Sequence, residues 1–121
     1  MQYFKFYTFS QGHGEAIMKV CLARDVLFRY EINLNRKHPQ PMQAAVDESL
    51  ENMRSRVNGY GGVIAIGLDG NIGIGFTTKH MPWAYIIDKD QTSSHTSVNL
   101  DHSQVVIHYG YDSGEHFIVK E

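Results

Sequence analysis

Cysteine is nearly absent from this 121-residue chain, since Cys21 is the single cysteine. One thiol can form no disulfide within the chain, and this composition fits a reducing compartment. Cys21 lies among apolar residues at helical spacing. We therefore expect a buried, inert thiol rather than a nucleophile.

The chain also lacks a long apolar run, and its first residues read Met-Gln-Tyr-Phe-Lys-Phe. We expect neither a signal peptide nor a membrane span, and hence a cytoplasmic protein. Basic residues are not clustered: 11 Lys and Arg stand against 13 Asp and Glu, which gives a net charge of −2. Sequence-independent binding of nucleic acid needs a basic face, so we expect no nucleic-acid partner.

Metal-ligand spacing is missing as well. The chain has seven histidines, and His102, His108 and His116 lie in or beside predicted strands. No pair of them has the tight spacing of a zinc site, and we expect no metal and no cofactor. No nucleophile-elbow pattern marks a serine, and the sequence leaves a Ser-His-Asp arrangement open.

A glycine-rich turn over residues 10–15, Ser-Gln-Gly-His-Gly-Glu, separates an aromatic strand (3–9) from a helical pattern (16–32). Gly12 and Gly14 permit positive φ and close backbone approach, and the helix start directs unpaired N–H groups into the turn. Such a turn can stabilise an anion or oxyanion, or it can simply be a sharp corner. If Gly14 needs positive φ or close packing, its replacement by valine should destabilise the fold by roughly 1–3 kcal/mol.

Apolar spacing defines the other elements. The first helix carries its expected buried stripe at Ile17, Val20, Cys21, Leu27 and Phe28. A second helix spans 41–57, with Pro41 in its first turn and Asn58-Gly59 as its stop. A β-hairpin over 64–76 turns at Asp69-Gly70-Asn71, and strands over 105–111 and 117–119 close the chain. Residues 88–103 are rich in polar residues and are predicted to form a flexible surface loop.

This order predicts an α+β fold: a single domain over 1–121, with an antiparallel sheet and two helices on one of its faces. The second sheet face is unusual. The first strand has aromatic residues on both sides, and Gly73 and Gly75 leave a bare surface suited to close contact with another sheet. We expect a homodimer or a protein partner to cover this second sheet face.

Several motifs lie in register over residues 10–84: Gly12-His13-Gly14-Glu15, Met53-Arg54-Ser55-Arg56, Gly61-Gly62-Val63-Ile64 and Met81-Pro82-Trp83-Ala84. Together they resemble the C-terminal part of the β-subunit of the isoaspartyl peptidase/L-asparaginases, N-terminal-nucleophile threonine hydrolases, and especially their animal members. The resemblance implies half of an αββα sandwich. It also implies hydrolysis of asparagine or isoaspartyl peptides.

In this family the nucleophile is a threonine whose own amine serves as the base. The resemblance places that threonine, and the arginine and aspartate that hold the substrate, upstream of the glycine turn and outside this chain. It implies that Gln11, Gly12 and Gly14 bind substrate and that no catalytic residue is present. Gln11 stands where the family usually has a threonine.

Two hypotheses follow. The chain is a truncated asparaginase-like protein that serves as a non-catalytic assembly or binding module, and we lean toward this reading for the chain alone. Alternatively, it is a portion of an active hydrolase, and the amide substrate binds only when a complementing chain completes the site.

Overall fold

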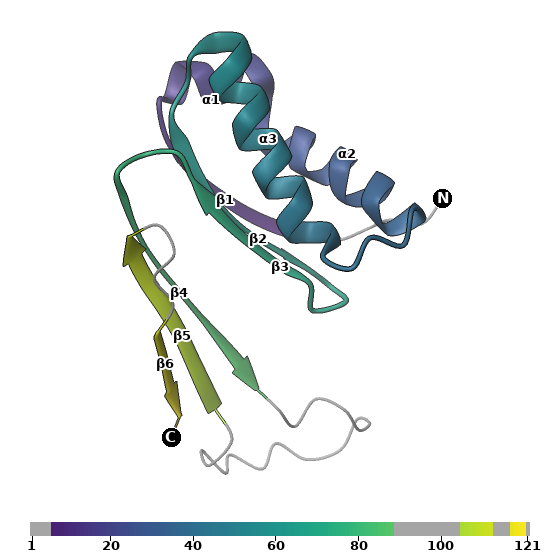
Figure 1. The fold of residues 1–121 in the computed structure, drawn as a ribbon, viewed down its shortest axis with the longest axis vertical. Helices are drawn as coiled ribbons and strands as arrows, with labels where there is room; N and C mark the ends of the chain where they lie inside the picture. Colours follow the sequence, from purple (N-terminus) through teal and green to yellow (C-terminus); the bar gives the residue numbers. More distant parts are fainter. Residues whose placement is uncertain (1–5, 89–104, 113–116, 121) are drawn as a thin grey trace. The chain divides into compact units, whose positions relative to one another are not determined.

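The computed structural model describes residues 6–88, 105–112 and 117–120 (Figure 1). The chain divides into two compact units, Met1–Lys79 and His80–Glu121, and each is described by itself. The first unit contains β1 (Phe6–Gly12), α1 (Gly14–Val20), α2 (Leu22–Asn35), α3 (Pro41–Val57), β2 (Gly61–Gly67) and β3 (Ile72–Phe76). The second contains β4 (His80–Asp88), β5 (Val105–Asp112) and β6 (Phe117–Lys120).

The α+β class is confirmed, but the described residues form three helices and two three-stranded sheets instead of two helices and one sheet. The prediction of a single domain over 1–121 stays a prediction. Among the described residues, no helix is both long and apolar enough to cross a membrane.

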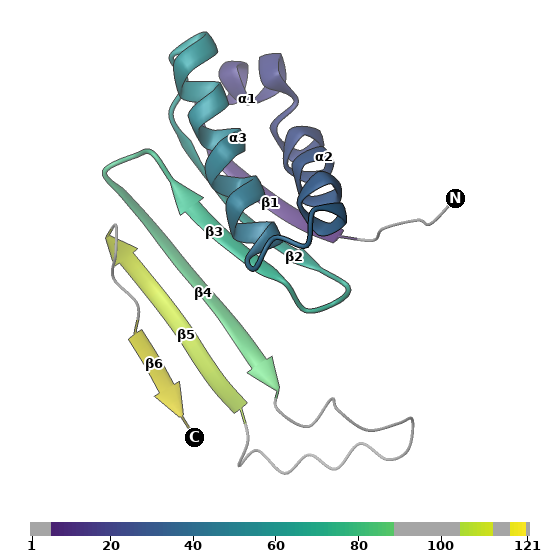
Figure 2. The same cartoon turned by 45° about the vertical axis from the view of Figure 1, so that its right-hand side comes forward.

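The first sheet has the order β1-β2-β3 with antiparallel pairing throughout. Its register places Phe9 opposite Ile64 and Ile64 opposite Ile74. All three helices lie on one face of this sheet (Figure 2). Because side chains alternate along a strand, that face takes every second residue, including the buried Val63 and Ala65.

Helix α3 forms where the spacing predicts it, from Pro41 to Val57. Its buried apolar residues recur at helical spacing: Met42, Ala45, Val46, Leu50 and Met53. Asn58 then takes a left-handed conformation (φ 51°), and the Gly59 N–H donates to the Met53 carbonyl at 3.3 Å. The stop at Asn58-Gly59 is therefore confirmed.

The predicted helix over 16–32 is wrong in one respect, because it is broken at Cys21. Cys21 adopts a left-handed conformation (φ 48°, ψ 57°), ending α1 and beginning α2. Its side chain is exposed, so the expectation of a buried thiol is also wrong. The break changes the phase of the helix. Leu22, Val26, Tyr30 and Asn33 are the buried residues of α2, and Phe28 is 51% exposed.

The bare glycine face of the hairpin meets a helix rather than a second sheet, which corrects the sequence-based expectation. A Cβ on Gly73 would lie 2.7 Å from the Met42 carbonyl oxygen, and one on Gly75 would lie 3.0 Å from Leu50 Cδ1. The glycines thus allow α3 to approach the sheet closely.

The opposite face of the first sheet is apolar and carries the exposed side chains. Tyr7 is 68% exposed, Phe9 66% and Ile66 40%. We call this surface the open face: Tyr7, Phe9, Ile64, Ile66, Ile72 and Ile74.

The second unit is an antiparallel sheet of order β4-β5-β6. The strands predicted over 105–111 and 117–119 are confirmed, and β4 is an additional strand. Aromatic rings stack across the strands: Tyr85 lies 4.6 Å from His108, and Tyr109 lies 5.2 Å from Phe117, between ring centroids. The loop predicted over 88–103 begins at the last residue of β4, and the remainder of it lies outside the described residues.

Candidate functional site

The glycine turn links the end of β1 to the start of α1. Gly12 is the last residue of the strand and has φ of 135°. A Cβ at this position would lie 2.4 Å from the Tyr60 carbonyl oxygen and 2.5 Å from the Gly61 Cα. Only glycine therefore fits where these two chain segments meet.

His13 holds the turn in place from the N-cap position of α1. Its backbone N–H donates to the Tyr60 carbonyl at 2.9 Å, and the Tyr60 N–H donates to His13 Nδ1 at 3.2 Å. The two rings also meet edge to face at 5.8 Å. Since Nδ1 accepts a backbone N–H, His13 has a structural role here.

Thr77, the residue directly after β3, also bonds to the segment that supports the glycine turn. Its Oγ1 accepts the Gly61 N–H at 3.1 Å, and its own N–H donates to the Gly61 carbonyl at 2.8 Å. The Thr77 hydroxyl also donates to that carbonyl at 3.2 Å. Sequence reasoning missed Tyr60, Gly61 and Thr77 as partners of the turn, although the double glycine at 61–62 was a usable signal.

The three predicted site residues are brought to one end of the first sheet, and all are exposed. Gln11 alternates with Phe9 and Tyr7 and so lies on the side of the open face. Gly14 is the first residue of α1, and no atom lies within 4 Å of a Cβ built on it. The expectation that Gly14 needs positive φ or close packing is wrong, because Gly12 carries that constraint.

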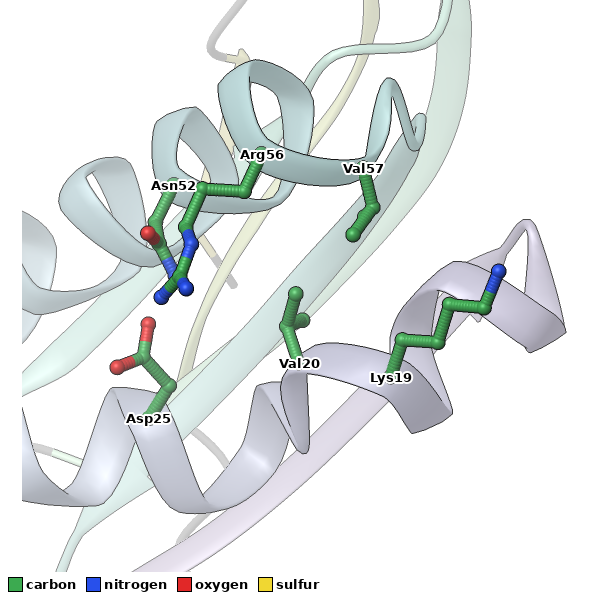
Figure 3. Close-up of a pocket in the computed structure, with 6 residues that line it drawn as sticks. All are labelled: Lys19, Val20, Asp25, Asn52, Arg56 and Val57. Carbon is green, nitrogen blue, oxygen red and sulfur yellow. The ribbon is translucent and has the colours of Figure 1, made fainter.

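A separate pocket of about 300 Å³ opens where the junction of α1 and α2 faces the end of α3 (Figure 3). Six residues line it: Lys19, Val20, Asp25, Asn52, Arg56 and Val57. The Asp25 carboxylate points toward the Arg56 guanidinium in Figure 3, and Asp25 already accepts a hydrogen bond from Arg29 at 3.0 Å. The pocket holds charges of both signs and no residue of the glycine turn.

Among the described residues, the pKa that is raised to about 12 belongs to a tyrosine away from both places. Tyr30 is 2% exposed and donates a hydrogen bond to Asp69, which also accepts one from Asn71 Nδ2 at 2.8 Å. Burial and the bond to Asp69 raise the pKa of Tyr30 to about 12. Partial desolvation acts to raise the pKa of Asp69, but the bonds from Tyr30 and Asn71 outweigh it and lower that pKa. These residues join α2 to the hairpin turn, which is a structural role.

The histidines considered as metal ligands do not form a cluster in the described part of the chain, where no three His, Cys, Asp or Glu side chains gather. His108 stacks on Tyr85 in the second sheet. His102 and His116 lie outside the described residues. His80 stacks on Tyr111 at 4.9 Å and contacts the Asp112 carboxylate.

Comparison with known proteins identifies the family. The sequence model of the family described as Asparaginase matches residues 9–96, and this segment contains both the glycine turn and the hairpin. The chain belongs to the asparaginase family. This confirms the resemblance to the isoaspartyl peptidase/L-asparaginases, including their animal forms.

Three curated relatives illustrate the similarity. The isoaspartyl peptidase/L-asparaginase of Xenopus laevis is 44% identical over 77 residues, which is 64% of this chain and 23% of the relative. The human protein of the same name is 39% identical over 90 residues, covering 68% and 27%, respectively. The Danio rerio protein is 36% identical over 106 residues, covering 88% and 27%. The chain thus spans about a quarter of the length of the relatives it matches.

Proposed function

We propose that this asparaginase-family chain acts as a non-catalytic assembly or binding module. The observation that carries the proposal is the open face beside the glycine turn, where Tyr7 and Phe9 are each about two-thirds exposed. A sheet face that meets water is normally polar, and contiguous apolar patches on soluble proteins usually mark an interaction surface. A homodimer or a protein partner would cover this face.

The surroundings of the glycine turn support the non-catalytic part of the proposal. The family resemblance assigns the chemistry to a threonine with a free amine, upstream of the glycine turn. Thr77, the threonine bonded at the turn, has its hydroxyl engaged with Gly61. Gln11 replaces the threonine expected beside Gly12, and its longer side chain would crowd a substrate pocket.

Hydrolysis by the purified 121-residue chain tests this proposal. Ammonia release from L-asparagine, and aspartate release from a β-aspartyl dipeptide, should not exceed those of a heat-denatured control. Oxyanion contacts without a nucleophile leave only a small part of the rate enhancement. Turnover clearly above the control, and lost in Gly12→Val, would overturn the non-catalytic assignment.

A second candidate is a portion of an active asparaginase or β-aspartyl peptidase that another chain completes. The observation that favours it is the turn itself, because Gly12 keeps its positive φ and Gly14 stays exposed. Co-expression with a relative that lacks the matching segment would then restore hydrolysis. Gly12→Val should abolish the restored activity, and an equally expressed, inactive mixture would count against this candidate.

A cytoplasmic location belongs to the same proposal and rests on the single cysteine of the sequence. Fractionation of cells that express the tagged chain would test it.

A further inference from the structure

The two edges of the first sheet are not equivalent. Its outer strands are β1 and β3. On β3, the Gln43 side chain from α3 forms two hydrogen bonds with Ile74: Gln43 Nε2 donates to the Ile74 carbonyl at 2.7 Å, and the Ile74 N–H donates to Gln43 Oε1 at 2.9 Å. This amide covers the middle of the β3 edge, as proteins commonly do to prevent further strand pairing.

The same pair shows which backbone groups of β1 face outward. The backbone N–H and C=O of Ile74 point away from β2, so the N–H and C=O of its partner Ile64 point toward β1. Phe9 pairs with Ile64, and its own N–H and C=O therefore point toward β2. The groups of the alternate residues Thr8 and Ser10 must then face away from the sheet. No described residue forms a backbone hydrogen bond with them at that edge.

Strand β1 lacks two common protections of an edge, a charged side chain and a proline. Its seven residues, Phe-Tyr-Thr-Phe-Ser-Gln-Gly, include no charge and no proline.

We propose that β1 pairs in antiparallel fashion with β1 of a second copy, about a two-fold axis at Phe9. This inference rests on the proposed assembly role and names the partner of the sheet edge, not that of the open face. Only this register pairs all seven residues of both strands. It also pairs the residues whose backbone N–H and C=O groups face outward in each copy. It sets Thr8 opposite the partner's Ser10 as a hydrogen-bonded pair. The open faces of the two copies become continuous.

Light scattering on the full chain tests the edge pairing. The wild type should show twice the 13.8 kDa of the single chain at tens of micromolar. Ser10→Pro deletes an outward N–H and leaves the β1–β2 ladder intact, so it should give a folded monomer. The matched variant Ile66→Glu alters the open face of the central strand β2 and should remain dimeric.

A wild type that is a folded monomer would overturn the inference. So would a dimer that Ile66→Glu dissociates and Ser10→Pro does not, since that result places the interface on the face. Neither result bears on the non-catalytic assignment, which the hydrolysis assay decides separately.

Cysteine cross-linking tests the register and does not depend on the folding of the proline variant. In a Cys21→Ser background, Phe9→Cys should form a disulfide dimer, because Phe9 opposes itself in a non-hydrogen-bonded pair with Cα atoms about 4.5 Å apart. Tyr7→Cys should not cross-link alone, and should do so when mixed with Gln11→Cys. Cross-linking of Tyr7→Cys alone, or none with Phe9→Cys, would overturn the pairing.

Discussion

Gly12 lies so close to the Tyr60 carbonyl oxygen that no side chain fits between them: a Cβ on Gly12 would lie 2.4 Å from that oxygen. The positive φ of 135° at Gly12 adds to the constraint. Gly14, two residues later, has no neighbouring atom within 4 Å of the same position. Of the two glycines of the turn, only Gly12 is therefore required to be glycine.

This difference predicts opposite outcomes for two alanine variants. Gly12→Ala should lower the free energy of unfolding by about 1–3 kcal/mol through backbone strain and the clash. Gly14→Ala should be neutral or stabilise by up to about 1 kcal/mol, since alanine favours the helix that begins there. Urea unfolding followed by circular dichroism measures both. Equal destabilisation by the two variants would contradict the assignment of the constraint to Gly12.

The break at Cys21 predicts which side of α2 matters for stability. Leu22 is 1% exposed, so Leu22→Ala should cost about 2–5 kcal/mol. Phe28 is 51% exposed, and Arg24 lies 5.5 Å above its ring. Phe28→Ala should therefore cost at most about 1 kcal/mol. If thermal unfolding showed a larger loss of stability for Phe28→Ala than for Leu22→Ala, the break at Cys21 would be contradicted.

Local patterns with a single physical interpretation could be predicted from the sequence. Helix α3 has a proline suited to its first turn, an apolar stripe and an Asn-Gly stop, and all three signals agree. The hairpin likewise combines a two-residue period with a turn at Asp69-Gly70-Asn71. The family followed from motifs of this kind spread over residues 10–84.

Features set by tertiary packing could not be predicted in the same way. Apolar residues continue through Cys21, so the periodicity gives no sign of the left-handed residue that changes the helix phase. A bare glycine face is equally consistent with an approaching helix or sheet, and only the position of Met42 against Gly73 decides it. At the candidate site, Tyr60 and Thr77 are distant in sequence from the turn that they support.

The bond between Tyr30 and Asp69 predicts a stability that depends on pH in the acid range. The pKa of Asp69 is lowered from 3.8 in the folded state, so its contribution is present above pH 3.8 and is lost as the pH falls through the folded pKa. Tyr30→Phe removes a donor to a charged acceptor and should cost about 1.5–3 kcal/mol at neutral pH. The difference from wild type should shrink toward pH 2. In an Asp69→Asn background, the stability lost through Tyr30→Phe should not vary with pH in the acid range. If that loss is also constant with pH when Asp69 is present, the linkage is contradicted.

The same tyrosine predicts an alkaline effect of opposite sign. Burial and the bond to Asp69 raise the pKa of Tyr30 from its ordinary 10.0 to about 12 in the folded state, so its contribution is complete below pH 10 and is lost as the pH rises toward 12. The stability difference between wild type and Tyr30→Phe should therefore fall over this interval. Urea titrations at pH 8, 10 and 11.5 measure it, and a difference that grows with pH would exclude a raised pKa.

The contact between Gly73 and α3 predicts a large cost for one added methyl group. In Gly73→Ala the new Cβ would meet the Met42 carbonyl oxygen at 2.7 Å and Val46 Cγ2 at 2.8 Å. Backbone atoms yield little, so the helix must shift, and we expect a loss of about 1–3 kcal/mol. Gly70→Asn is the matched control: this glycine has φ of 84° with no atom within 4 Å, and asparagine tolerates that conformation. The control should lose less than about 1 kcal/mol in urea unfolding. A Gly73→Ala protein as stable as wild type would mean that α3 does not lie against the glycine face.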